Sequence, residues 1–345
     1  MRLSARLFAL CLPLLSLPAL AETVDSLYQV REAVASQEPE ERSAALDRAL
    51  ETLVLRLTGD PKAIQSPNLS EVRKDPQQLV SQYVYEGERL VVDFDPLTTE
   101  NKLREAGLPL WGSNRPVILA WWLNNDAAGS SLVGDAQDGA APLQQAARHR
   151  GLPLRLPLAD LQEQFLATSE NLSAAQPDAL QESVQRYGAD ALLAVQARED
   201  NGQWQAEWRL WLGDSREQGT SQGADRHALA DAVLLAVSER LAPRFVVKPG
   251  SVSSMTLEVE GADLARYAEL GRLLEPFAAR LVRVQGDLLV WQVNASAQQL
   301  RAQLGLADLR EVPVEAEAQD AGADSQGGAE PLPSPAPKNL MRFRW

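Results

Sequence analysis

The sequence predicts a multi-domain protein of the α/β to α+β class, in which mixed sheets carry packed helices. The chain has 345 residues, which is more than one hydrophobic core usually supports. Helix-like and strand-like apolar patterns alternate along most of its length. The pattern falls into three units, which we place at residues 22–113, 114–248 and 253–313.

The first unit, residues 22–113, contains the clearest predicted helix. Its apolar residues recur every three or four positions over residues 40–57, and Gly59 with Pro61 ends the pattern. Strands are expected at residues 27–34, 83–85 and 90–95, and a short helix at residues 98–106. This arrangement predicts an α+β domain.

The second unit, residues 114–248, is expected to be a mixed sheet with helices packed on it. Its elements follow the order strand, helix, strand, helix, strand, strand, helix. A buried strand is expected at residues 117–123, and residues 124–141, rich in small and polar residues, are expected to form a loop. The fold class of this unit is therefore α/β.

A tryptophan-rich hairpin is the most distinct part of the second unit. Residues 191–197 form an apolar strand, Asn201-Gly202 supplies the turn, and residues 203–212 alternate strictly. Trp204 and Trp208 share the apolar face of the second strand and are expected in the core. Trp211 lies on the opposite, polar face, where we expect it to be exposed and available for an interaction.

The third unit, residues 253–313, has the element order βαββαβ. That order is typical of a small ferredoxin-like domain. Strands are expected at residues 255–259, 281–284, 288–293 and 309–312, and helices at 264–274 and 296–304.

Residues 314–338 and 339–345 differ from the rest of the chain. The longer segment has five acids, four prolines and almost no large apolar residue, so we expect a disordered linker. In the final segment Met341, Phe343 and Trp345 alternate, which predicts a C-terminal strand. Two interpretations stay open: the strand returns to the edge of the third unit's sheet, or it docks on a partner by strand addition.

The first 21 residues have the layout of a secretory signal peptide. Arg2 and Arg6 precede an apolar run, and Ala19 and Ala21 stand at the −3 and −1 positions of a cleavage site. The run is too short to span a bilayer, so no integral membrane span is expected after cleavage behind Ala21. We therefore predict a periplasmic protein. The single cysteine, Cys11, leaves with the signal, which excludes disulfides and thiolate chemistry from the mature chain.

Charge and motif content narrow the class of function. The net charge is −14, and cleavage would deepen it to −16 because it removes two arginines and no acid. Such a chain is a poor partner for nucleic acid and for anionic lipid. The sequence has no phosphate-binding glycine loop, no serine elbow and no histidine pair at a metal-ligating spacing. We expect no cofactor and no metal, and we expect His149 and His227 to be solvated.

Carboxylates remain as candidate site residues. Asp93 and Asp95 flank Phe94 on one strand face, where they form either a paired acid site or the solvated face of the strand. Asp190 precedes a buried strand, where it either caps a turn or lines a crevice.

These observations predict an accessory factor of the cell envelope that binds other envelope proteins and catalyses nothing. One alternative is an envelope hydrolase that uses Asp93 and Asp95 as paired carboxylates. The other is a binder of a small ligand between the first two units. The residues singled out for interaction are Asp93, Asp95, Asp190, Trp211, Met341, Phe343 and Trp345.

A resemblance to a known family rests on several short motifs. They lie at residues 42–59, 94–95, 107–112, 115–116, 121–123, 150–153, 156–160 and 186–190. Together they resemble the domain-of-unknown-function 2066 family, exported proteins of Gram-negative bacteria without an assigned activity. The resemblance implies export and supplies no catalytic residue. More loosely, the second unit is similar to periplasmic anticodon-binding-like domains, such as the N-terminal domain of the Tol-system propeller protein.

Overall fold

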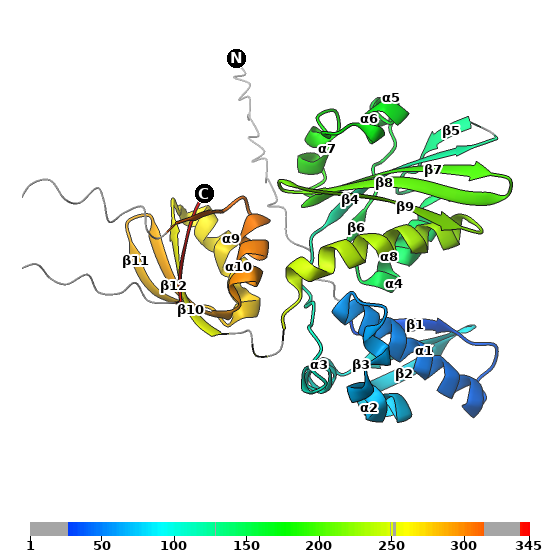
Figure 1. Cartoon of the computed structure of the whole chain (residues 1–345), viewed down its shortest axis with the longest axis horizontal. Helices are drawn as coiled ribbons and strands as arrows, with labels where there is room; N and C mark the ends of the chain where they lie inside the picture. Colours follow the sequence, from blue (N-terminus) through cyan, green and yellow to red (C-terminus); the bar gives the residue numbers. More distant parts are fainter. Residues whose placement is uncertain (1–26, 128, 249, 251–252, 314–338) are drawn as a thin grey trace, which may run out of the picture.

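The computed structural model describes residues 27–127, 129–248, 250, 253–313 and 339–345. These residues form three sheets with helices packed on them, which confirms the predicted multi-domain α+β architecture. Figure 1 shows an N-terminal domain in blue and cyan, a middle domain in green and a C-terminal domain in orange. Among the described helices, none combines the length and apolar character needed to cross a bilayer. The predicted signal peptide (residues 1–21) and linker (314–338) lie outside the described residues.

The N-terminal domain packs one long helix on a small antiparallel sheet. Its strands lie in the order β1 (Gln29–Ala33), β3 (Arg89–Phe94) and β2 (Val80–Glu86). Helix α1 (Pro39–Thr58) buries the predicted apolar stripe against this sheet, and Gly59 ends it in the left-handed conformation. Shorter helical segments complete the domain: η1 (Ala63–Gln65), η2 (Pro67–Leu69), α2 (Ser70–Lys74), η3 (Pro76–Leu79) and α3 (Pro96–Glu105).

The middle domain is a six-stranded mixed sheet. Its strand order is β5-β4-β7-β8-β9, with β6 also paired to β4. The predicted hairpin is present, because β7 and β8 pair in register from Ala191↔Leu212 to Asp200↔Gln203. The strands are β4 (Ile118–Asp126), β5 (Gly129–Leu132), β6 (Leu154–Arg155), β7 (Ala191–Asp200), β8 (Gln203–Leu212) and β9 (Ser215–Gly223).

Helices cover both faces of the middle sheet (Figure 1). Helices α4 (Ala140–Arg150) and α8 (Arg226–Phe245) pack on the face that carries Trp204 and Trp208. The opposite face is covered by α5 (Leu161–Leu166), α6 (Ser169–Ser173) and α7 (Gln181–Arg186). Trp211 lies beneath that second layer and is only 7 % exposed. The expectation that Trp211 is exposed was therefore wrong, because short helices without a clear apolar period cover its face.

Two strands of the middle domain lie where none was predicted. Strand β9 contains no large apolar residue, yet it pairs with β8 along its whole length. Gly219 on β9 lies under the ring of Trp208, and a Cβ there would stand 2.4 Å from Trp208 Cζ2. Strand β5 lies within the predicted loop 124–141 and pairs with the end of β4. An edge strand of this kind needs no apolar alternation, which explains why the pattern missed both.

The C-terminal domain follows the predicted βαββαβ order and adds one strand. Its elements are β10 (Ser253–Glu260), α9 (Leu264–Leu274), η4 (Glu275–Phe277), β11 (Arg280–Gln285), β12 (Leu288–Ala295), α10 (Ala297–Gly305), β13 (Arg310–Val312) and β14 (Leu340–Arg344). The sheet order is β11-β12-β10-β14-β13. The C-terminal strand thus lies inside the sheet, parallel to β10 and antiparallel to β13, and not at its edge.

A buried arginine joins the N-terminal and middle domains. Arg115 is 1 % exposed, and its guanidinium lies 4.3 Å from the ring centroid of Trp111. Burial, and then the charge of Arg56, lower the pKa of Arg115 to about 9, so the group stays charged at neutral pH. Its N–H groups donate to the backbone carbonyls of Arg56, Trp111, Gly112, Arg150 and Gly151. These bonds hold the connection between the domains in one conformation.

Candidate functional site

The two carboxylates predicted as a pair have separate structural contacts. The oxygens of Asp93 accept hydrogen bonds from Gln29 Nε2 at 2.7 Å and from Gln82 Nε2 at 2.8 Å, across all three strands of the sheet. Asp95 caps helix α3, where its carboxylate accepts the Thr98 N–H at 2.8 Å. Hydrogen bonds from Thr98 lower the pKa of Asp95. Each carboxylate therefore accepts hydrogen bonds of its own, Asp93 within the sheet and Asp95 at the start of α3.

Asp190 and Trp211 come together in a cleft between the middle and C-terminal domains. The cleft has a volume of about 860 Å³ and is lined by α7, the β8–β9 turn and the end of α8 on one side, and by α10 and β13 on the other. Asp190 Oδ2 accepts the Val117 N–H at 2.7 Å, so this residue joins the segments that lead into β7 and β4. Burial raises the pKa of Asp190. Trp211 Nε1 has no hydrogen-bond partner within the described part of the chain.

The three C-terminal candidates belong to the core of their own domain. Met341 and Phe343 are 5 % and 2 % exposed and pack with the apolar residues of β10 and β12. Trp345 is half-buried, with the guanidinium of Arg266 at 5.3 Å from its ring centroid. In this structure the final strand completes its own sheet, so its apolar side chains are not displayed toward a partner.

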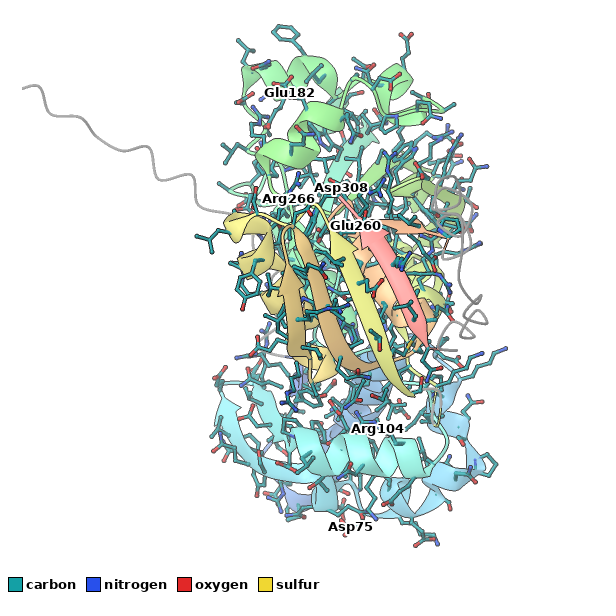
Figure 2. The ribbon with its side chains drawn as sticks, turned by 90° about the vertical axis from the view of Figure 1, so that its left-hand side faces the viewer. Asp75, Arg104, Glu182, Glu260, Arg266 and Asp308 are labelled. Carbon is teal, nitrogen blue, oxygen red and sulfur yellow. The ribbon has the colours of Figure 1, made fainter. Side chains whose placement is uncertain are left out.

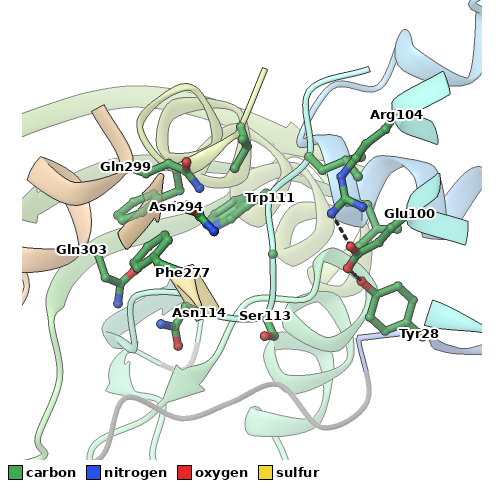
Figure 3. A pocket seen from close by; sticks show the side chains of 15 residues that line it. Tyr28, Glu100, Arg104, Trp111, Ser113, Asn114, Phe277, Asn294, Gln299 and Gln303 are labelled. Atoms are coloured by element: carbon green, nitrogen blue, oxygen red, sulfur yellow. Dashed lines mark hydrogen bonds and ion pairs between the residues drawn. The ribbon is translucent and has the colours of Figure 1, made fainter. Parts of the chain in front are cut away.

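A cavity of about 400 Å³ lies where the three domains meet (Figure 3). Tyr28, Glu100 and Arg104 line its N-terminal side, and both Tyr28 and Arg104 donate hydrogen bonds to the Glu100 carboxylate. Burial, and then the hydrogen bond to Glu100 and the charge of that carboxylate, raise the pKa of Tyr28. The other side is uncharged and carries Trp111 from the domain connection and residues of the C-terminal domain, among them Asn294, Gln299 and Gln303. Trp111 Nε1 and Gln303 Nε2 are buried without a hydrogen-bond partner among the described residues.

The most exposed large apolar side chains of the middle domain lie on α5 and among the residues before it. We call Leu158, Leu161 and Phe165 the apolar row; their exposed fractions are 69 %, 70 % and 73 %. The spacing of four residues brings Leu161 and Phe165 to one side of the helix, and Leu158 lies before its first turn. Sequence reasoning missed the row because large apolar residues normally indicate core. One signal in the sequence pointed away from a core segment. In residues 153–160, prolines and charged residues interrupt the apolar pattern.

The backbone that carries the apolar row is held by a buried glutamate. Glu163 is fully buried and forms a capping box with Asp160 at the start of α5. Its carboxylate accepts hydrogen bonds from Tyr187 Oη at 2.7 Å and from the Arg186 guanidinium. Ala159, just before the box, has a φ of +56°, a conformation that non-glycine residues rarely adopt. A strained, firmly bonded segment that exposes three large apolar side chains is typical of a binding surface.

His149 lies at a domain junction and not on a fully solvated surface. Its Nε2 is 3.0 Å from Thr52 Oγ1 on α1, and its Nδ1 is 3.5 Å from Asp231 Oδ1 on α8. The order hydroxyl, imidazole, carboxylate resembles a nucleophile with its base. However, the Thr52 side chain is buried and also donates to Glu32. The chain of contacts therefore connects two domains, which is a structural role.

The described residues include no group of three or more His, Cys, Asp or Glu side chains arranged to hold a metal ion.

Comparison with known proteins gives one family match. Residues 21–112 match the model of a domain of unknown function, DUF8605, and these residues span the N-terminal domain. No curated protein matches the chain at a significant level. Among solved structures, the crystal structure of lipoprotein GNA1162 from Neisseria meningitidis is similar at 18 % identity, over 37 % of this chain and 96 % of that one. Its TM-score of 0.18 is too low to support any conclusion about fold or function.

The resemblance to the domain-of-unknown-function 2066 family was wrong, because the family model that matches is DUF8605. The motifs that suggested it have local structural roles in this chain. Gly59 and Gly151 end helices in the left-handed conformation, and Asp190 bonds to the backbone just before β4. Such signals recur wherever a helix ends or a strand begins, so they do not identify a family.

Proposed function

We propose that the protein is an accessory factor of the cell envelope that acts by binding another envelope protein. The observation that carries this proposal is the apolar row, Leu158, Leu161 and Phe165, exposed on a segment anchored by Glu163. Exposed large apolar side chains gain free energy when a partner removes them from water. The predicted signal peptide supports an encounter in the periplasm.

The charge of the chain supports a protein as the partner. With a net charge of −14, the chain is repelled by nucleic acid and by anionic lipid headgroups. An apolar groove on a protein has no such repulsion, and Leu161 and Phe165, four residues apart on α5, have a spacing usual for the anchors of such a groove. We therefore place a partner's apolar groove against the row.

Photo-crosslinking tests this proposal. A photoreactive amino acid at position 165 is expected to capture a defined envelope protein in cells, and purified partner and chain should then bind each other. Leu161→Asp should abolish both capture and binding without lowering the melting temperature, because Leu161 is exposed. Leu264→Asp is the matched control, since Leu264 is an equally prominent leucine, 84 % exposed, on the C-terminal domain. Capture that survives Leu161→Asp, or is lost equally with Leu264→Asp, would overturn the proposal.

The cavity where the three domains meet supports a second candidate, the binding of a small uncharged ligand. Trp111 Nε1 and Gln303 Nε2 are two buried N–H donors without a partner among the described residues, and both line this cavity. A buried donor left unpaired costs about 1–3 kcal/mol, which an acceptor on a ligand would recover. Because Glu100 and Arg104 are already paired, an uncharged ligand that carries carbonyl or hydroxyl oxygens fits best.

A thermal-shift measurement with neutral sugars and N-acetylated sugars tests the second candidate. At least one is expected to raise the melting temperature of the wild-type protein. Gln303→Met, which removes the amide at similar volume, should reduce that shift. Gln292→Met, on the C-terminal sheet and outside the cavity lining, should leave it unchanged. The second candidate would be ruled out if no sugar raised the melting temperature. It would also be ruled out if Gln303→Met left the rise in melting temperature unchanged.

The hydrolase alternative has little support from the contacts of Asp93 and Asp95. Asp93 bridges two glutamines of neighbouring strands, and Asp95 caps a helix. A paired-carboxylate mechanism needs one carboxyl group with a raised pKa, whereas the pKa of Asp95 is lowered.

A further inference from the structure

The cleft between the middle and C-terminal domains contains a carboxylate that its own chain stabilises only in part. Asp190 lies between α7 and β7 and lines this cleft, whose volume is about 860 Å³. Its Oδ2 accepts the Val117 N–H at 2.7 Å. Burial raises the pKa of Asp190 by more than this hydrogen bond and the charge of Arg155 lower it. A cation bound in the cleft would replace hydration that the carboxylate loses on burial.

The indole of Trp211 lines the same cleft and carries an unsatisfied hydrogen-bond donor. Trp211 pairs across the sheet with Leu192, two residues beyond Asp190, so the two side chains start from neighbouring positions of the backbone. Trp211 is 7 % exposed, and its Nε1 has no acceptor in the described part of the chain. A buried donor of this kind is costly unless a ligand or water supplies an acceptor. The cleft thus combines an anionic acceptor with a nearby N–H donor.

The remaining side chains of the cleft favour a cationic ligand with an apolar group. Its apolar lining includes Val184, Leu192, Leu212 and Phe245. Arg301 also lines the cleft, but it is neutralised by an ion pair with Glu311, with 2.6 Å between Nε and Oε2. The other charged lining residues are the acids Asp190, Asp214 and Asp308 and the bases Arg244 and Arg310.

Acids therefore outnumber bases among the remaining charges, and the net charge of the chain, −14, also attracts cations. Figure 2 shows Asp308 where the C-terminal domain meets the green middle domain. An ammonium group can in addition interact favourably with the aromatic lining, Trp211 and Phe245.

We propose that this cleft binds an α-ammonium group followed by a carbonyl, the chemistry shared by amino acids and the amino termini of peptides. The ammonium group pairs with the Asp190 carboxylate, and the carbonyl oxygen accepts the Trp211 N–H. An apolar side chain next to the ammonium group packs on the apolar lining. This proposal is independent of the apolar row. It concerns a different site from the cavity where the three domains meet, since of the described residues Phe245 alone lines both.

Calorimetric titration of the full chain with L-leucinamide tests the site, because this probe carries the ammonium group, the carbonyl and an apolar side chain. L-leucinamide is expected to bind, and N-acetyl-L-leucinamide, which has no charge, should bind at least about 10-fold more weakly. Titration with L-leucine and with leucyl-glycyl-glycine identifies the source, a free amino acid or a peptide end, and binding of either supports the proposal. No binding of L-leucinamide, or equal binding of its acetylated form, would overturn it.

Variants of the two proposed contacts locate the binding site. Asp190→Asn keeps an acceptor for the Val117 N–H but removes the charge, so L-leucinamide should bind at least about 10-fold more weakly. Glu199→Gln is the matched control, because it removes an exposed acid at the far end of β7 and should leave binding unchanged.

Trp211→Phe keeps an aromatic ring but removes the N–H. It should cancel the preference of the wild-type protein for L-leucinamide over isopentylamine, an amine without the carbonyl. Equal weakening by Asp190→Asn and Glu199→Gln, or a preference that persists in Trp211→Phe, would contradict the assigned contacts. The comparison of probes on the wild-type protein needs no variant, so it decides the proposal even if a variant fails to fold.

Discussion

Buried charged side chains in this protein mainly hold backbone segments in place. Arg115 donates hydrogen bonds to five backbone carbonyl oxygens, and Arg56 likewise donates to the carbonyls of Leu27, Gln29 and His149. Asp190 and Glu163 accept backbone or side-chain donors at the ends of strands and helices. A buried charge is tolerated only where such donors or acceptors replace its hydration. These residues are therefore sensitive points for stability.

The pH dependence of stability should reveal the role of Asp190. Burial raises its pKa, so between the unfolded value of about 3.9 and the raised folded value the folded protein binds more protons than the unfolded chain. The contribution of Asp190 to the free energy of unfolding consequently falls as the pH rises through this window. Asp190→Asn keeps an acceptor for the Val117 N–H without the charge, so it should stabilise the protein near neutral pH.

Urea unfolding of both proteins between pH 3 and pH 8 measures this effect. The gain in unfolding free energy of Asp190→Asn over the wild-type protein should be smallest at pH 3. It should become constant at pH values above the raised pKa of Asp190. A constant difference across the range would show that the ionisation of Asp190 does not contribute.

At the scale of elements, α5 is a six-residue helix that depends on its cap. A helix this short is unstable in isolation, so the capping box of Asp160 and Glu163 and the contacts with Arg186 and Tyr187 define it. The same contacts fix where the apolar row points. The capping box is formed by residues close in sequence, Asp160 and Glu163. The groups that bond to the Glu163 carboxylate come from the end of α7.

Glu163→Gln should destabilise the protein by about 2 kcal/mol, because it removes a buried charge that Arg186 and Tyr187 contact. Chemical denaturation measures the loss, and faster hydrogen exchange of the amides in α5 should accompany it. Glu170→Gln, an exposed acid on the neighbouring α6, is the control and should change stability by less than about 0.5 kcal/mol. Equal effects of the two changes would contradict the anchoring role of Glu163.

At the scale of the whole molecule, the N-terminal domain packs directly against the middle domain. Gly59 at the end of α1 approaches α8 so closely that a Cβ would stand 2.1 Å from Ala242 Cβ. Two further contacts between the domains come from Arg115 and from His149. These contacts form a firm junction, whereas the C-terminal domain meets the middle domain mainly through α10, with Gln298 Nε2 donating to the Pro243 carbonyl at 2.8 Å.

Alanine substitutions at two glycines distinguish the stability cost of backbone strain from the cost of disturbed packing between the domains. Gly59 and Gly107 both have positive φ, +65° and +79°, but a Cβ at Gly107 meets nothing within 4 Å. Gly107→Ala should therefore cost only about 1–2 kcal/mol of strain. Gly59→Ala should cost at least about 2 kcal/mol more, because α1 and α8 must move apart. If chemical denaturation gave both variants the same loss of unfolding free energy, the junction between α1 and α8 would accommodate the added methyl group without cost.

Most elements could be predicted because their apolar residues repeat over short distances. Helix α1, the hairpin β7–β8 and the βαββαβ order all follow from periods that neighbouring residues define. Strand β9 and the helices α5 and α6 could not be predicted in this way. Strand β9 is polar throughout, and the two helices are too short for an apolar period.

The candidate sites were less predictable than the fold. Asp190 and Trp211 were singled out separately, and only the structure brings them to one cleft. The cavity where the three domains meet combines residues from Tyr28 to Gln303, a separation that no local pattern reports. The apolar row went unnoticed because composition does not distinguish an exposed leucine from a buried one.

By itself, the sequence determined the division into α+β units, the hairpin and its turn, and the alternation of the last strand, because each depends on neighbouring residues. Only the tertiary structure decided which faces are covered, and so that Trp211 is buried and Leu161 exposed. It also decided that the last strand lies between β10 and β13. These outcomes depend on pairings between segments far apart in the chain, and a local pattern carries no information about such partners.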